Sequence, residues 1–385
     1  MGYLHRPHVL WWRKALFQVH LWIGVIIGLY IIAICSTGCV LVFEQDLLND
    51  RPPLSGPPAH PAPDWEQLVR TAMQAYPGST LADIDMRSSN RRMVPVGLAS
   101  GKRTLIVYVD SYTDRIVKHE DLERKHWLVE FALRLHTELA LGARGAIADG
   151  IGGAFLFVMA VIGIVLWWPG IRVWKRALKI DWHARWAAIS FDLHRSFGFW
   201  CFPLIAMWGI TGVYFIFPNA GRIAINLLSN TASLDQLPSR WEPGGPVLPV
   251  SDFIRRAQRL YPGDRLAYAY MDVNRPHGEV QVYMSPDPSV PMELLEDEVV
   301  FDPASGAILM NTSTARWTAG ERFSLGVYSV HFGDFGGLPL QILWALLGLV
   351  PAVLVITAYV MWWNRSLRKK WFKLTTRTGP YASSP

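Results

Sequence analysis

Four long apolar stretches dominate the pattern of hydrophobic and polar positions along the chain. Residues 21–43, 197–217 and 338–363 carry no charged side chain, and residues 146–168 carry only Asp149, near their start. About 20 apolar residues in a helix cover a hydrocarbon core of roughly 30 Å. We therefore expect four transmembrane helices. The first stretch is too long for a signal-peptide core and has no small-residue cleavage pattern after it, so we expect it to be retained.

The two long segments between these stretches, residues 44–145 and 218–337, have the pattern of folded domains. Each opens with an amphipathic stretch that ends at a Tyr-Pro-Gly sequence. These stretches predict helices, and the alternating runs that follow predict strands and turns. We expect two small α+β domains, preceded by a proline-rich linker. The ranges are 64–76 and 252–261 for the helices, 104–109 and 279–284 for strands, 110–114 and 302–306 for turns, and 51–63 for the linker.

The chain contains two copies of one unit. The copies match without gaps across a membrane span when His20 is aligned with His194, and again when His136 is aligned with His331. Each copy reads helix, polar domain, helix, so we expect parallel repeats related by a pseudo-twofold axis along the membrane normal. The other matched positions are Gly24 and Gly198, Thr37-Gly38 and Thr211-Gly212, Phe43 and Phe217, Gly142 and Gly337, Gly153 and Gly348, and Trp167-Trp168 and Trp362-Trp363.

The distribution of positive charge predicts the orientation in the membrane. The short segments 1–19, 169–196 and 364–385 hold 15 Lys and Arg in 69 positions, whereas the two long segments hold 22 in 222. The positive-inside rule places residues 1–20, 169–196 and 364–385 in the cytoplasm and both long segments outside. Anionic lipid headgroups thus account for the net charge of +6, and no nucleic-acid partner is needed.

Composition and cysteine usage narrow the class further. Hydrophobic residues make up 51% of the chain and charged residues 18%, which excludes a disordered or fibrous protein and argues against a soluble enzyme. Cys35, Cys39 and Cys201 all fall in predicted membrane helices, where we expect them to pack as small apolar residues. The long segments therefore fold without disulfides. No Cys-x-x-Cys-His occurs, which excludes covalently attached c-type haem.

Four repeat-matched histidines are the candidate chemistry. We expect His20 and His194 at the cytoplasmic mouths of the first and third spans, and His136 and His331 just before the second and fourth, at the outer face. A single histidine at a membrane edge is usually an interfacial or packing residue, but four at matched positions predict two level pairs. A low-spin b-type haem takes two axial imidazoles, so we predict two haems, one on each pair.

Other residues support or compete with this prediction. Glycines one helical turn from the inner histidines, Gly24 and Gly198, would let a macrocycle approach the backbone. Zinc is the rival metal, but no cysteine or carboxylate lies at ligand spacing around either pair. Candidate propionate partners are Arg134, Arg144 and Arg195, with ordinary interfacial anchoring as the alternative. His126 is a candidate substitute ligand, the Trp-Trp pairs fit an aromatic belt, and the histidines expected at the surface are His5, His8, His60, His119, His183 and His277.

These motifs together resemble the PepSY-associated transmembrane family from about residue 10 to 370. They are the histidine-glycine and Thr-Gly sequences of both copies, the tandem Tyr-Pro-Gly domains and the Trp-Trp pairs. Within that family the chain is most similar to siderophore-iron reductases of the bacterial inner membrane, of the ferrioxamine type. The resemblance implies two periplasmic PepSY domains, haem b in the membrane and reduction of ferric siderophore in the periplasm.

Reduction is a chemically reasonable way to release siderophore iron, but the sequence does not identify the electron donor. Hard oxygen donors hold Fe(III) much more strongly than Fe(II), so reduction releases the iron. No glycine-rich dinucleotide sequence follows a strand, and the cytoplasmic segments are too short for a flavin domain. Quinol or a separate cytoplasmic reductase are the candidate donors. Two other functions also remain. One is a haem-free PepSY scaffold or regulator. The other is a siderophore permease, against which we count the single ionisable residue of the four spans, Asp149, and the lack of a predicted broken helix pair at the midplane.

Overall fold

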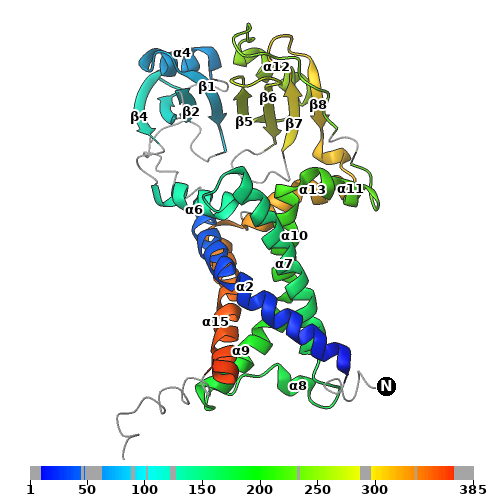
Figure 1. Cartoon of the computed structure of the whole chain (residues 1–385). Helices are drawn as coiled ribbons and strands as arrows, with labels where there is room; N and C mark the ends of the chain where they lie inside the picture. Colours follow the sequence, from blue (N-terminus) through cyan, green and yellow to red (C-terminus); the bar gives the residue numbers. More distant parts are fainter. Residues whose placement is uncertain are drawn as a thin grey trace, which may run out of the picture. The chain divides into compact units, whose positions relative to one another are not determined.

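The computed structural model describes residues 10–44, 47, 63–87, 92–100, 103–121, 127–231, 235–286, 296–333 and 336–367. Contacts divide the chain into two units (Figure 1). The first comprises Met1–Val42, Phe131–Pro218 and Gln341–Pro385, and we call it the helical unit. The second comprises Phe43–Glu130 and Asn219–Leu340, and we call it the sheet unit. The predicted linker 51–63 lies outside the described residues except for Pro63.

Long apolar helices build the helical unit. Three helices in the described part of the chain are long and apolar enough to cross a membrane: Trp11–Leu41, Ala143–Trp167 and Gly337–Ser366. A fourth span results only if a bent helix pair counts as one. The elements are α2 (Trp11–Leu41), α6 (Trp127–Glu138), α7 (Ala143–Trp167), α8 (Trp174–Ala177), α9 (Trp186–Trp200), α10 (Phe202–Ile216), α14 (Gly337–Gly348), α15 (Val350–Trp362) and η5 (Trp363–Leu367).

The third apolar stretch is not the single straight helix that its composition predicts. It is divided between α9 and α10, which meet at Cys201 with a bend of 66°. Pro203 lies in the first turn of α10. Because proline has no N–H and its ring clashes with the carbonyl four residues earlier, one continuous helix cannot pass this point. The expectation of one continuous helix over residues 197–217 was therefore wrong.

Two helices also extend beyond the apolar stretches that predict them. α2 begins ten residues before the predicted span and α9 eleven residues before it. His20 and His194 consequently lie inside helices, not at their ends. The polar start of α2 is stabilised by a tertiary contact, because Arg13 donates to the carbonyl oxygens of Val165 and Leu166 in the last turn of α7. Those carbonyls have no partner within their own helix.

The sheet unit contains one antiparallel sheet of eight strands in the order β4-β3-β2-β1-β5-β6-β7-β8. Helices α4 (Trp65–Ala75) and α12 (Val250–Leu260) were both predicted. The two predicted turns are closed by backbone hydrogen bonds, in which Asp114 N–H donates to Asp110 O and Gly306 N–H donates to Asp302 O. The strands are β1 (Thr80–Asp85), β2 (Met93–Ser100), β3 (Arg103–Asp110), β4 (Arg115–Asp121), β5 (Arg265–Asp272), β6 (Glu279–Ser285), β7 (Asp297–Phe301) and β8 (Ile308–Thr312), and further helices are α11 (Pro218–Asn226), η4 (Thr314–Arg316) and α13 (Ala319–Phe332).

The two predicted α+β domains are halves of this one sheet. Strand β1 pairs with β5, and Ile84 lies opposite Ala269. Each would otherwise be the exposed edge of a four-stranded half, and pairing satisfies their backbone groups. A single core runs through both halves, with Leu68 of α4 and Phe253 of α12 fully buried in it. The two copies of the repeat are therefore joined through equivalent strands, β1 and β5.

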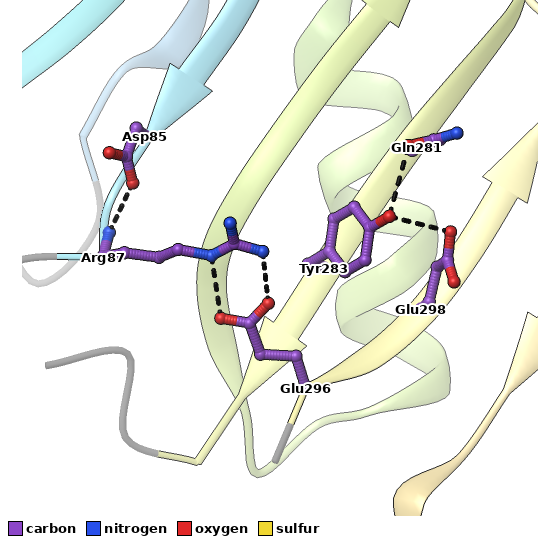
Figure 2. A network of polar contacts seen from close by, with 6 residues as sticks. All are labelled: Asp85, Arg87, Gln281, Tyr283, Glu296 and Glu298. Atoms are coloured by element: carbon purple, nitrogen blue, oxygen red, sulfur yellow. Dashed lines mark hydrogen bonds and ion pairs between the residues drawn. The ribbon is translucent and has the colours of Figure 1, made fainter. Parts of the chain in front are cut away.

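A buried ion pair joins the halves beside this seam. Arg87 follows β1, and its Nε donates to Oε1 of Glu296 at 2.9 Å, across 209 positions of sequence. Figure 2 shows the guanidinium spanning both carboxylate oxygens of Glu296. The guanidinium also lies 4.7 Å from the ring centre of Tyr268 and 5.3 Å from that of Tyr283. Tyr283 in turn donates to Glu298, so the network continues across the second half of the sheet (Figure 2).

Asp83 in β1 gives the sheet unit a predictable response to pH. Burial, and then the charge of Asp85, raise the pKa of Asp83 to about 6 from an ordinary value of 3.8. Between these values the unfolded chain ionises while the folded chain keeps its proton, so the free energy of unfolding falls as pH rises. We expect Asp83→Asn to be more stable than wild type by about 1–3 kcal/mol at pH 7.5, but by no more than about 0.5 kcal/mol at pH 4.

Thermal unfolding of the full chain in detergent at the two pH values measures this difference. Asp114→Asn, in the exposed turn between β3 and β4, is the matched control and should leave the melting temperature unchanged at both. An equal gain for Asp83→Asn at both pH values would show that ionisation of this carboxyl does not destabilise the fold.

Candidate functional site

Two histidines from the two copies of the repeat lie together in the helical unit. His20 comes from α2 and His194 from α9, and their ring centres are 6.4 Å apart with the ring planes at 88°. Both side chains are half-buried. A metal–imidazole bond is about 2.0–2.1 Å and the bonded nitrogen lies about 1.1 Å from the ring centre, so two imidazoles on opposite sides of one ion have centres about 6.3 Å apart. The observed ring-centre separation of 6.4 Å is close to this value.

The hydrogen bond of His194 determines which of its nitrogens is free. Nδ1 lies 2.9 Å from the backbone oxygen of Leu354 in α15. A carbonyl oxygen only accepts, so Nδ1 carries the proton and donates it. Nε2 then has its lone pair available, which is the form of imidazole that binds a metal.

The Nδ1 atom of His136 has the same kind of backbone contact at a different place in the helical unit. His136 lies in the last turn of α6, and its Nδ1 donates to the backbone oxygen of Ile34 in α2 at 3.0 Å. Gly38 makes this approach possible, because a Cβ atom there would lie 2.9 Å from Cε1 of His136. The repeated Thr-Gly sequence was the signal for Gly38, although its contact with a histidine was not predicted. Immediately after α6, Leu139 and Ala140 adopt left-handed backbone conformations, a strain typical of functional segments.

Several buried polar atoms of the helical unit have no hydrogen-bond partner among the described residues. One of these atoms is Nδ1 of His20. The same ring lies near Gly163 of α7, one helical turn before Trp167, because its Cε1 atom would contact a Cβ added at Gly163. Unpartnered buried donors are costly, so each of these atoms is a candidate contact for a further polar ligand. Indole and guanidinium N–H groups suit carboxylate oxygens. The remaining atoms are Trp167 Nε1, Trp168 Nε1, Ser190 Oγ and Arg195 Nε.

The fourth histidine, His331, lies in the last turn of α13, in the sheet unit. Helix α13 begins with a capping box between Thr318 and Glu321 and ends at Gly333, whose φ of 74° suits a left-handed cap. His331 is half-buried, with its ring centre 5.7 Å from that of Phe332. Because His136 belongs to the other unit, the pairing of these two histidines stays a prediction.

The three candidate propionate arginines have different surroundings. Arg195 is paired with Asp192 at 2.8 Å, which leaves its buried Nε as the unpartnered atom. Arg134 is exposed and lies 3.5 Å from Glu138 on its own helix. Arg144 is exposed in the first turn of α7. Of the three, only Arg195 combines burial with a free donor, so it is the strongest candidate for an anionic ligand.

The glycines and cysteines have specific packing roles. Gly24 lets α2 approach Met159, whose methyl carbon would lie 3.2 Å from an added Cβ, whereas Gly198 has nothing within 4 Å among the described residues. A role of these two glycines in admitting a macrocycle stays a prediction. All three cysteines are free, and the thiol of Cys39 donates to Ala345 O at 3.1 Å. This agrees with the prediction of packing residues.

The other histidines of the described residues lie at the surface. The exposed ones are His119, His183 and His277, as predicted, whereas His5, His8, His60 and His126 lie outside the described residues. Within the described part of the chain, no group of three or more histidine, cysteine or carboxylate side chains is placed to hold a metal ion. A pair of imidazoles needs a further ligand set, which a macrocycle supplies.

Long apolar helices joined to a sheet-containing unit define a membrane protein. The chain belongs to the family of PepSY-associated TM regions, whose sequence pattern it matches over residues 17–365. No curated protein matches it in sequence. The resemblance to the family seen in the sequence is therefore confirmed, while the narrower similarity to siderophore-iron reductases stays a prediction.

Proposed function

We propose that this protein is a di-haem b reductase of the bacterial inner membrane that passes electrons outward to ferric siderophore in the periplasm. The observation that carries the proposal is the 6.4 Å separation of His20 and His194, two repeat-related imidazoles on different helices. His194 presents an unprotonated Nε2 because its Nδ1 donates to Leu354 O. The Nδ1 atom of His136 likewise donates to the backbone oxygen of Ile34. In this proposal His136 is paired with His331.

The chain's own residues would position and insulate the cofactors. When bound, haem b supplies one-electron chemistry between Fe(III) and Fe(II). His20 and His194 would hold one haem, and Arg195 would bind a propionate. Electron flow toward the positive outer face gains about 2.3 kcal/mol per 100 mV of membrane potential. The ferric siderophore takes up one electron and its oxygen ligands then release Fe(II), while quinol or a separate cytoplasmic reductase supplies the electron.

Purified protein from haem-replete cells tests the cofactor and the reaction separately. We expect a Soret band and about two haems per chain by pyridine haemochrome. After anaerobic reduction with dithionite and removal of the excess, ferric hydroxamate chelate should reoxidise the haems, and the same chelator without iron should not. Colourless protein would favour the haem-free scaffold or regulator instead.

The outer pair gives a prediction of its own. His136→Ala and His331→Ala should each lower the haem content from about two to about one per chain, because either change removes one axial ligand of the same haem. The double variant should lose no more than either single one. His183→Ala, at an exposed position, is the control and should keep both haems. Loss of both haems in the double variant would mean that the two histidines serve different haems.

One observation favours a permease as the second candidate. The bend of 66° between α9 and α10 is the kind of broken helix pair found in transporters. Proteoliposomes loaded without reductant distinguish the two functions, because a permease would accumulate intact ferric chelate there and a reductase would not.

A further inference from the structure

Both well-placed histidines share a second contact besides the carbonyl oxygen. Nδ1 of His194 lies 3.2 Å from Oγ1 of Thr357, and Nδ1 of His136 lies 3.2 Å from Oγ1 of Thr37. In each case the threonine stands three positions after the residue whose carbonyl also accepts, Leu354 or Ile34. The two sites therefore have the same pair of acceptors.

In these contacts the imidazole is the donor and the threonine hydroxyl is the acceptor, because the single proton of each hydroxyl is used elsewhere. Thr37 Oγ1 lies 2.9 Å from Ala33 O and 3.0 Å from Ile34 O, in the preceding turn of α2. Thr357 Oγ1 lies 2.9 Å from both Val353 O and Leu354 O. Each hydroxyl donates its one proton to its own helix, so only a lone pair is left for the imidazole N–H. Both threonines are buried, so no bulk water replaces that acceptor.

The repeat does not account for this arrangement. Thr37 has a counterpart in the second copy, Thr211, but the position matched to Thr357 in the first copy is Ile162, which has no hydroxyl. The threonine of each site therefore comes from a position that the symmetry does not relate to the other. Two independent placements of the same pair of acceptors indicate a requirement of the site itself.

We propose that Thr37 and Thr357 are positioning residues that orient the imidazoles of His136 and His194 and lower the reduction potentials of the haems bound there. This inference rests on the proposed function. An acceptor on Nδ1–H makes Nε2 a stronger electron donor, which stabilises Fe(III) over Fe(II). The carbonyl alone fixes the tautomer, and the hydroxyl adds a second acceptor that restricts rotation of the ring.

Spectroelectrochemical titration of valine variants tests the proposal. Valine keeps the shape of threonine and removes the lone pair. Thr357→Val should raise the potential of the haem held by His194, and Thr37→Val that of the other haem, each by a threefold to tenfold change in the Fe(III)/Fe(II) ratio, or about 28–59 mV. The unaffected haem in each variant is an internal reference. His194→Ala, which retains only the outer haem, assigns the two potentials.

Conservative and neighbouring changes separate tuning from general damage. Thr357→Ser and Thr37→Ser keep the hydroxyl and should restore the wild-type potentials. Ser36→Ala and Thr137→Val remove exposed hydroxyls next to Thr37 and His136. These hydroxyls donate to Ile32 O and Leu133 O of their own helices, so neither change should move a potential. Two bound haems with unchanged potentials in both valine variants would overturn this inference and leave the proposed function standing. Wild-type protein without haem would overturn both.

Discussion

His194→Ala is expected to remove one of the two haems and to abolish electron transfer across the membrane. The ring centre of His194 lies 6.4 Å from that of His20, and its tautomer is fixed by a carbonyl of α15. Alanine leaves His20 as the single protein ligand, which does not hold a low-spin bis-histidine haem. We expect haem content to fall from about two to about one per chain, and reduction of external ferric chelate by internal reductant in proteoliposomes to be lost.

The partner variant makes this expectation specific. His20→Ala should give the same haem content and the same loss of transfer, and the double variant should be no worse, because all three lack the same cofactor. His183→Ala, with a fully exposed side chain in the same segment of sequence, should behave as wild type. Retention of two haems by His194→Ala would contradict the assignment of His194 as a ligand.

Arg87→Ala is expected to cause the largest loss of stability in the sheet unit. Its partner Glu296 has a side chain only 1% exposed, so removal of the guanidinium leaves a buried carboxylate without its counter-charge. Breaking such a pair costs about 3–5 kcal/mol. Because the pair links the end of β1 to the start of β7, we expect the loss to concentrate in the strands at the seam. Hydrogen exchange of amides in β1 and β5 should accelerate more than about 100-fold.

A double substitution distinguishes the unpaired charge from the loss of packing. Arg87→Met with Glu296→Met removes both charges and keeps much of the volume, so it should recover most of the protection. Arg255→Ala is the control, because its pair with Asp252 lies within one helix turn at the surface and contributes about 0–1 kcal/mol. Equal acceleration in the single and double variants would place the stabilising effect in the stacking of Arg87 on Tyr268 and Tyr283.

Local and periodic features of the sequence were sufficient for much of this picture. The apolar stretches around α2, α7 and α15, the helices before both Tyr-Pro-Gly sequences and the turns at Asp110 and Asp302 need no distant contact to be predicted. Each is encoded by neighbours within one element, because hydrophobic periodicity and turn residues act over a few positions. The repeat added long-range information, since a matched His20 and His194 implied facing positions.

What the sequence by itself determined is the membrane class, the repeat and the histidines to consider. Only the tertiary structure decided that α9 bends at Cys201, that β1 and β5 merge two halves into one sheet, and that Gly38, Thr37 and Thr357 surround the imidazoles. These facts depend on contacts between residues far apart in the chain. Neither hydrophobic periodicity nor a gapless repeat records which carbonyl or hydroxyl of another helix will face a given side chain.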